Sequence, residues 1–160
     1  MIVVCDSTVL IGLARIGRLE LLQQVFGQIL IPRTVFREVA GKGLNRPGAK
    51  FIKEANWIKV TEIKDRSQVA FLLGSLDEGE AEVLALAKES NADLILVDEE
   101  KARKIALIAG FEVMGLLGLF LLAKSTGILQ RVGPLVEELK GKNFRISDRV
   151  ISETLKRAGE

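Results

Sequence analysis

The sequence predicts an α/β fold: a three-layer α/β/α sandwich around a central, mainly parallel sheet of about five strands. Residues 2–5 and 94–97 are unbroken apolar runs, each followed by a helical pattern, which is typical of strands buried on both faces of a parallel sheet. Strand and helix patterns then alternate along the chain. Residues 1–160 contain no internal repeat and no linker, so we expect a single domain. Its core should cover about residues 1–125, and a helical C-terminal extension about 126–160.

The predicted strands are short apolar segments bounded by turn residues or helical patterns. In chain order they cover residues 2–5, 28–31, 57–61, 94–97 and 111–114. The predicted helices repeat apolar residues every three or four positions. They cover residues 8–26, 34–40, 49–55, 67–73, 75–89, 100–109, 116–125, 135–140 and 148–158.

Capping and turn residues set several of these boundaries. Gly27 ends the first helix, and Pro32 stands where the second can begin. Ser75 and Glu78 form a candidate capping box for the helix that reaches residue 89. Glycines and a proline between residues 41 and 48 predict a flexible basic loop.

The composition removes several kinds of catalytic site. The chain has no His, no Tyr and a single cysteine. Ser-His-Asp and Cys-His catalysis are therefore excluded, as are zinc sites built on histidine. Cys5 lies inside a predicted buried strand, so we expect a core residue and not a nucleophile. What remains for catalysis is mainly carboxylates with oxygen-preferring ions such as Mg²⁺ or Mn²⁺.

Composition and hydropathy indicate a soluble cytoplasmic protein. The 48% apolar content fits a compact fold, and a net charge of +2 is too balanced to identify a partner. The N-terminus begins directly with a strand and shows no signal-peptide pattern. The longest apolar stretch, residues 113–123, is too short to span a bilayer, so we expect no membrane association.

Asp6 and Asp98 directly follow the two buried strands. In an open parallel sheet, ligands bind in the crevice outside the carboxyl ends of the strands. An ionised carboxylate there is costly unless a cation or hydrogen-bond donors satisfy it. Two such carboxylates suggest a divalent metal ion, and hence a metal-dependent enzyme.

The helix over residues 75–89 adds a third candidate. At about 100° per residue, Glu80 lies in the middle of its apolar stripe. A carboxylate there must be paired, protonated or metal-bound, and we expect a metal ligand, with a neighbouring Lys or Arg as the alternative. Asp77 flanks the stripe and either assists or is only a first-turn helix acid. The acids predicted to form an ordinary solvated face are Glu78, Glu82 and Glu89.

On pattern alone Glu38 is a surface residue, but a resemblance changes that expectation. The order and spacing of the acidic positions resemble those of the PIN domain: Asp6-Ser7-Thr8, then Glu38, Glu80 and Asp98. The segments LDEGEAEVLALA and ADLILVDEEKARKIA are similar to a toxin-related prokaryotic subgroup of that family. The resemblance covers about the first 125 residues, and the helical tail is similar to extensions in the subgroup. PIN-domain proteins are metal-dependent ribonucleases, and many prokaryotic members are toxins of toxin–antitoxin pairs.

The resemblance implies that four carboxylates converge on one or two Mg²⁺ or Mn²⁺ ions: Asp6, Glu38, Glu80 and Asp98. A bound cation would offset their mutual repulsion and lower the pKa of its water, supplying a hydroxide without any histidine. Attack on RNA would leave a 5′-phosphate and a 3′-hydroxyl. Ser7 either hydrogen-bonds a ligand carboxylate or a metal-bound water, or caps the following helix.

RNA approaches an acidic site across a basic rim. We expect phosphate contacts from residues after Asp98 and from the loop after Glu38, with an ordinary solvated surface as the alternative. The candidates are Lys101, Arg103, Lys104, Lys42 and Arg46, and Lys50 and Lys53 lie near the second group.

Partners and rival functions remain open. The run over residues 116–122 is apolar nearly all round, so it is either covered within the fold or part of a homodimer contact, which the resemblance favours. The helix over residues 148–158 either closes the fold or receives an antitoxin. The alternatives to a ribonuclease are an aspartate-based phosphohydrolase or receiver, and a catalytically silent module that binds RNA or protein.

Overall fold

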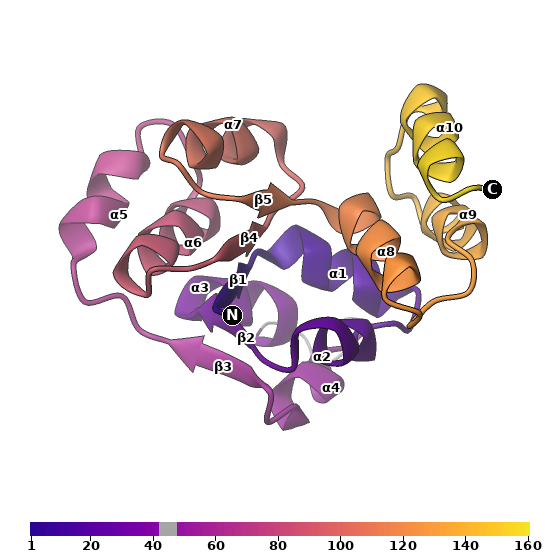
Figure 1. Ribbon diagram of the computed structural model, residues 1–160. Coiled ribbons are helices and arrows are strands. Elements are labelled where there is room, and N and C mark those ends of the chain that lie inside the picture. The colour runs from indigo at the N-terminus through magenta and orange to yellow at the C-terminus, as the bar shows by residue number, and fades with distance from the viewer. Residues whose placement is uncertain (42–47) are drawn as a thin grey trace.

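The computed structural model describes residues 1–41 and 48–160. These residues form a five-stranded sheet with helices on both sides (Figure 1). The strands are β1 (Val3–Cys5), β2 (Ile29–Pro32), β3 (Ile58–Thr61), β4 (Leu94–Leu96) and β5 (Val113–Met114). They lie in the order β3-β2-β1-β4-β5, and every pairing is parallel. The predicted three-layer α/β/α fold is confirmed.

The register of the two central strands brings the acidic residues to one edge of the sheet. Cys5 of β1 stands opposite Leu96 of β4. Asp6 directly follows Cys5, and its N–H donates to the Leu96 carbonyl at 3.0 Å. Asp98 lies two residues beyond Leu96. Both acids therefore leave the sheet side by side at its carboxyl edge.

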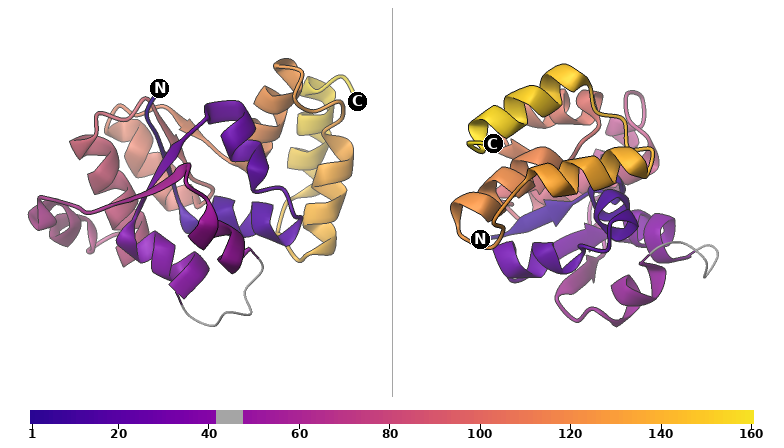
Figure 2. Two further views of the ribbon diagram at one scale, coloured as in Figure 1. Left: turned by 90° about the horizontal axis from the view of Figure 1, so that it is seen from below. Right: turned by 90° about the vertical axis from the view of Figure 1, so that its right-hand side faces the viewer.

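Helices pack on both faces of the sheet. In chain order they are α1 (Ser7–Arg15), α2 (Glu20–Phe26), α3 (Arg33–Phe36), α4 (Ala49–Glu54), α5 (Arg66–Leu72), α6 (Glu78–Glu89), α7 (Glu100–Ile108), α8 (Leu116–Ser125), α9 (Gly133–Gly141) and α10 (Asp148–Arg157). Helices α5, α6 and α7 lie on one side, and α1, α2, α4 and α8 on the other (Figure 1). Helices α9 and α10 lie beside α8 at one end of the molecule, as the views in Figure 2 also show.

Two predicted helices differ from the structure. The helix expected over residues 8–26 is two helices, because Gly17 adopts a left-handed conformation with a φ of +66° and turns the chain between α1 and α2. The helix expected over residues 34–40 ends after one turn as α3 and continues as a π-helical turn, Arg37–Gly41.

The start of α6 also differs from the prediction. The helix begins at Glu78, and the proposed capping box of Ser75 with Glu78 is wrong. Asp77 is the N-cap and pairs reciprocally with Glu80, three residues on. The capping box keeps the predicted three-residue spacing between the N-cap acceptor and the Glu, but it lies two residues farther along the chain.

The core lies on both faces of the sheet and under α8. Cys5 is fully buried, as expected, and burial raises the pKa of its thiol. Leu116, Leu119 and Phe120 of α8 are also fully buried, and α8 contacts α2 and α10. The apolar run over residues 116–122 is therefore covered in part within the fold, while Leu117, Leu121 and Leu122 keep partial exposure. Among the described helices, none has the length and apolar character needed to cross a membrane.

Candidate active site

Asp6 caps α1 from the end of β1 and is 3% exposed. Its Oδ1 accepts a hydrogen bond from the Val9 N–H at 2.9 Å, which satisfies one of the free donors of the first helical turn. Burial raises the pKa of Asp6 to about 7, and the negative charges of Asp98 and Glu80 add to the rise. The N–H groups of Val9 and Asp98 act in the opposite direction. Asp6 is therefore about half protonated at neutral pH when no cation is bound.

Asp98 is half-buried beyond β4 and is held from α8. Its two oxygens share the Leu116 N–H at 3.2 and 3.1 Å. Burial raises its pKa, while this hydrogen bond and the charge of Arg103 lower it. A Cβ atom on Gly115 would collide with Asp98 Oδ1 and would lie 2.9 Å from Arg103 Nη1. Only glycine leaves room for the carboxylate at this position.

Glu80 lies in the first turn of α6 and folds back onto the helix start. Its Oε1 accepts from the Asp77 N–H at 3.0 Å, and Asp77 Oδ1 accepts from the Glu80 N–H at 2.8 Å. Burial raises the pKa of Glu80 to about 7, and the neighbouring Asp77 and Glu99 carboxylates contribute. Glu99, which was not predicted, shares a side-chain hydrogen bond with Glu80 and caps α7 through the Ala102 N–H at 2.7 Å.

The surroundings of Glu80 and Asp77 correct the sequence-based view of both. Glu80 is half-buried and forms a capping box, so it does not sit deep in the apolar stripe of α6. Asp77 is exposed and is the N-cap, which is the first-turn role considered for it as an alternative. The helical periodicity does not show that the Glu80 carboxylate turns back toward the Asp77 N–H at the start of the helix.

Glu38 lies in the π-helical turn after α3, a kind of turn that is frequent at functional sites. Its Oε2 accepts a hydrogen bond from Ser7 Oγ at 2.9 Å. A Cβ atom on Gly79 would collide with Glu38 Oε1, so the carboxylate lies directly against the first turn of α6. Ser7 thus contacts a candidate ligand, which is one of its two predicted roles, while Asp6 is the residue that caps α1.

The predicted acids gather at one edge of the sheet from four elements. Asp6 is influenced by the charges of Asp98 and Glu80, and Glu38 reaches the same region through Ser7. The donor set suits a hard cation, since it consists of carboxylate oxygens. Within residues 1–41 and 48–160, no three acidic side chains stand ready to enclose a metal ion. Binding would therefore require side-chain rotation, as expected for carboxylates that repel one another without a cation.

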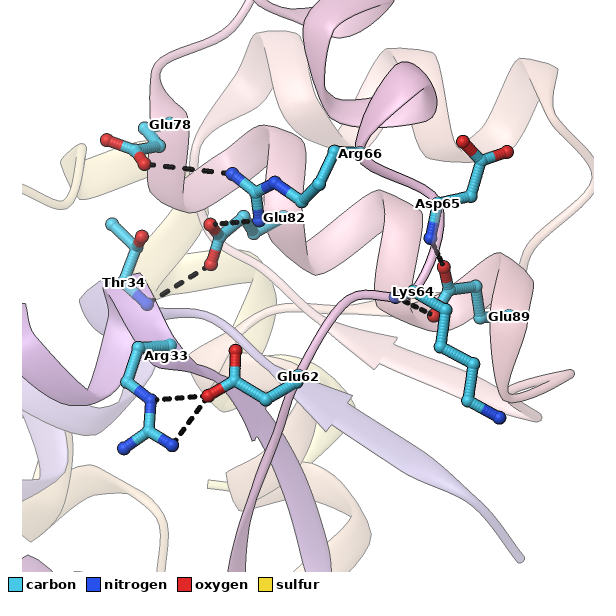
Figure 3. Close-up of polar contacts among 9 residues, drawn as sticks. All are labelled: Arg33, Thr34, Glu62, Lys64, Asp65, Arg66, Glu78, Glu82 and Glu89. Atoms are coloured by element: carbon cyan, nitrogen blue, oxygen red, sulfur yellow. Dashed lines mark hydrogen bonds and ion pairs between the residues drawn. The ribbon is translucent and has the colours of Figure 1, made fainter.

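Glu82 was expected on a solvated face, and this is wrong. It is 3% exposed, because α3 and α5 pack against that side of α6. Its carboxylate accepts from the Thr34 N–H at 3.1 Å and from Arg66 Nη1 at 2.9 Å (Figure 3). Thr34 belongs to α3, which leads directly into the turn that carries Glu38. Glu82 therefore connects the helix of Glu80 to the segment of Glu38.

Two further acids on this side of α6 also have partners. Glu89 accepts from the N–H groups of Lys64 at 3.0 Å and Asp65 at 2.6 Å (Figure 3). Glu78 lies 3.9 Å from Arg66. These contacts attach α5 and the segment before it to α6, and they lie on the side of the helix away from Asp6.

The basic residues proposed to contact RNA are distributed unevenly. Arg103 is half-buried beside Asp98 and lowers its pKa. Lys101 and Lys104 are exposed, and Lys104 pairs with Glu100 at 3.1 Å. The other candidates are exposed on α4 or lie outside the described residues: Lys50 and Lys53 in the first case, and Lys42 and Arg46 in the second.

Comparison with known proteins identifies the family. The sequence model of a family described as a PIN domain matches residues 2–160. The matched range spans every described element from β1 to α10. No curated protein matches the chain.

Proposed function

This chain belongs to the PIN-domain family, whose members are generally nucleases, and we propose that it is a metal-dependent endoribonuclease. The observation that carries the proposal is the environment of Asp6. This buried carboxylate has a pKa of about 7 because of its burial and because Asp98 and Glu80 place further negative charge beside it. Such a cluster is unfavourable by itself, and a divalent cation would neutralise it.

The chain's own residues would hold and orient the reacting groups. The proposed ligands of one or two Mg²⁺ or Mn²⁺ ions are Asp6, Glu38, Glu80 and Asp98. A divalent cation supplies a water of lowered pKa and stabilises charge that develops on the phosphate. Ser7 orients Glu38 through their hydrogen bond. Arg103, which lies beside Asp98, would contact a phosphate of RNA.

Cleavage of RNA tests the proposal directly. Single-stranded RNA is incubated with the protein and Mn²⁺, beside the variants Asp98→Asn and Glu80→Gln. We expect the parent to cleave the RNA to products with a 5′-phosphate and a 3′-hydroxyl. EDTA should abolish cleavage, and both variants should lose it. RNA binding without cleavage would support the silent binding module, and an acid-labile phosphate on Asp6 would support the phosphohydrolase.

The biological role proposed for this nuclease is that of a cytoplasmic toxin with a protein antitoxin. A small reading frame for such a partner beside the gene would support it. The homodimer implied by the resemblance would use apolar side chains at the surface, and α8 offers the half-buried Leu117, Leu121 and Leu122. The large apolar side chains exposed on the described surface include Phe71 of α5 and Ile108 of α7.

A further inference from the structure

A groove of about 940 Å³ runs from Asp98 to the C-terminal helix α10. Side chains of β5, α7 and α8 line one part of it, and residues 143–147 and α10 line another. Ligand pockets hold about 300–1,000 Å³, so the groove has room for a short chain segment and not for a folded domain.

The charges along the groove change with distance from the proposed metal site. The end beside that site carries the carboxylates of Asp98, Glu99 and Glu100. Two of these already take part in the site, because Asp98 is a proposed ligand and Glu99 is hydrogen-bonded to Glu80. Glu100 pairs with Lys104.

Farther along, positive charge is in excess. The charged side chains there are Arg145, Arg157 and Glu153, while Arg103 lies at the other end, beside Asp98. Glu153 lies 3.5 Å from Arg157 and offsets one of the two cations. Arg145 is exposed and has no ion pair among the described residues.

The C-terminal extension gives this part of the groove a regular wall and an apolar floor. The groove side of α10 carries residues at the spacing of one helix face: Val150, Glu153, Thr154 and Arg157. The half-buried Phe144 and Leu117 side chains line the floor. A positively charged groove with an accessible aromatic ring is the arrangement that binds single-stranded nucleic acid, because phosphates meet the cations and bases stack on the ring.

We propose that this groove binds the nucleotides that flank the scissile phosphate of a single-stranded RNA, with Arg145 and Arg157 contacting its phosphates. The inference rests on the proposed function, since the RNA must continue to Asp98. An extended peptide would contact the apolar floor, but its uncharged backbone would leave Arg145 without a counter-charge. An RNA strand supplies one phosphate for each nucleotide.

Binding of a fluorescein-labelled single-stranded RNA of mixed sequence tests the groove. Anisotropy is measured over a range of salt concentrations in an Asp98→Asn background, which prevents cleavage. The double variant R145E/R157E is compared with R149E/K156E, which makes the same change in charge on exposed residues outside the groove lining. We expect the groove pair to weaken binding about tenfold at physiological salt. The slope of log K against log salt should fall by about 1.4, or about 0.7 for each phosphate that an arginine no longer neutralises.

Equal weakening by the two pairs, or no effect of the groove pair, would overturn the inference. That is also the result expected if a peptide occupies the groove. Because binding is measured without cleavage, this experiment tests the groove independently of the proposed function. If RNA binds through the groove but the parent never cleaves it, the nuclease proposal is contradicted and the groove proposal is not. With Asp98 intact, the groove pair should raise KM for a long RNA, whereas the control pair R149E/K156E should not. Circular dichroism verifies that each variant is folded.

Discussion

Asp6 makes the stability of the metal-free protein depend on pH, and Glu80, whose pKa is also raised to about 7, acts in the same direction. The pKa of Asp6 is about 7 in the folded protein, against a usual value of about 4 in an unfolded chain, so folding retains a proton that the unfolded state has lost. Stability should therefore fall as the pH rises from about 4 to about 7 and stay level above that range. Asp6→Asn removes this penalty and keeps an oxygen that can accept the Val9 N–H.

We expect Asp6→Asn in EDTA to be more stable than the parent at pH 8, by as much as about 3–4 kcal/mol. The difference should shrink to a few tenths of a kcal/mol near pH 4, where the parent is protonated in the folded state and about half protonated in the unfolded state. Urea unfolding at the two pH values measures it. A gain of the same size at pH 4 would contradict the electrostatic account, and so would a less stable variant at pH 8.

Gly79 is the point at which Glu38 meets α6, and Gly79→Ala tests that contact. The added methyl group collides with Glu38 Oε1 and should displace the carboxylate. We expect Mn²⁺ affinity to fall by about tenfold or more in isothermal titration calorimetry. Gly141→Ala is the matched control, because Gly141 is also helical and has open space around it. Unchanged Mn²⁺ affinity in Gly79→Ala would mean that Glu38 takes no part in the metal site.

The sequence predicted the four acids but not their partners. Asp6 and Asp98 became candidates because a carboxylate after a buried strand is unusual, and Glu38 only through the family resemblance. Three further residues matter because they contact segments that are distant in the chain: Glu99, Gly79 and Gly115. A local sequence pattern cannot show such contacts. Conservation of the two glycines in related sequences would be the signal able to reveal them.

Helix α6 links the two halves of the site, and Glu82 is the residue that makes the link. Its hydrogen bond to the Thr34 N–H fixes the start of α3, and α3 continues into the turn that carries Glu38. Glu89 offers a matched control on the same helix, since it also accepts backbone N–H groups but holds the segment before α5 instead.

We expect both Glu82→Gln and Glu89→Gln to lose about 1–3 kcal/mol of stability, because each weakens charge-assisted hydrogen bonds. Only Glu82→Gln should weaken Mn²⁺ binding, by about tenfold, because only Glu82 positions the turn of Glu38. Calorimetric titration with Mn²⁺ at a temperature where both variants are folded separates the two effects. Equal Mn²⁺ affinity in the two variants would reduce Glu82 to a purely structural role.

Helices with a strong apolar periodicity were predicted well. The errors occur where packing between distant segments determines the helix bounds or the burial of a side chain. Helix α8 has the predicted bounds, residues 116–125. The break at Gly17 was missed because the apolar spacing continues across it. The face of α6 that holds Glu82 was taken for a solvated face because periodicity cannot show that α3 and α5 cover it.

At the scale of the whole molecule, the two buried strands and the strand–helix alternation were enough to predict the parallel sheet. The position of the C-terminal extension could not be predicted, because helical periodicity shows which face of a helix is apolar but not which element packs on that face. The structure sets α10 beside α8 and next to the groove that begins at Asp98. The extension thus completes the surface on which the substrate is proposed to lie, and its attachment to the core becomes a functional question.

Glu160 provides much of that attachment. Its carboxylate accepts from the N–H groups of Val132 at 2.8 Å and Gly133 at 3.0 Å, and it pairs with Lys124 of α8 at 2.9 Å. These contacts lower its pKa to about 2, with the Val132 hydrogen bond as the largest cause. Because the folded pKa is depressed, the stabilisation is present above the unfolded value of about 4.3 and is lost as the pH falls toward 2.

We expect Glu160→Gln to lower Tm by a few degrees at pH 7 and by clearly less at pH 2.5, since most of the stabilisation that comes from the depressed pKa has been lost at that pH. Glu153→Gln is the control, because it removes a carboxylate from an exposed ion pair on α10 and should change Tm little. Differential scanning calorimetry at both pH values measures the two variants. The same drop at pH 7 and pH 2.5 would show that Glu160 holds the extension by packing and not by its charge. A drop confined to neutral pH, together with weaker RNA binding at that pH, would connect this one carboxylate to the geometry of the groove.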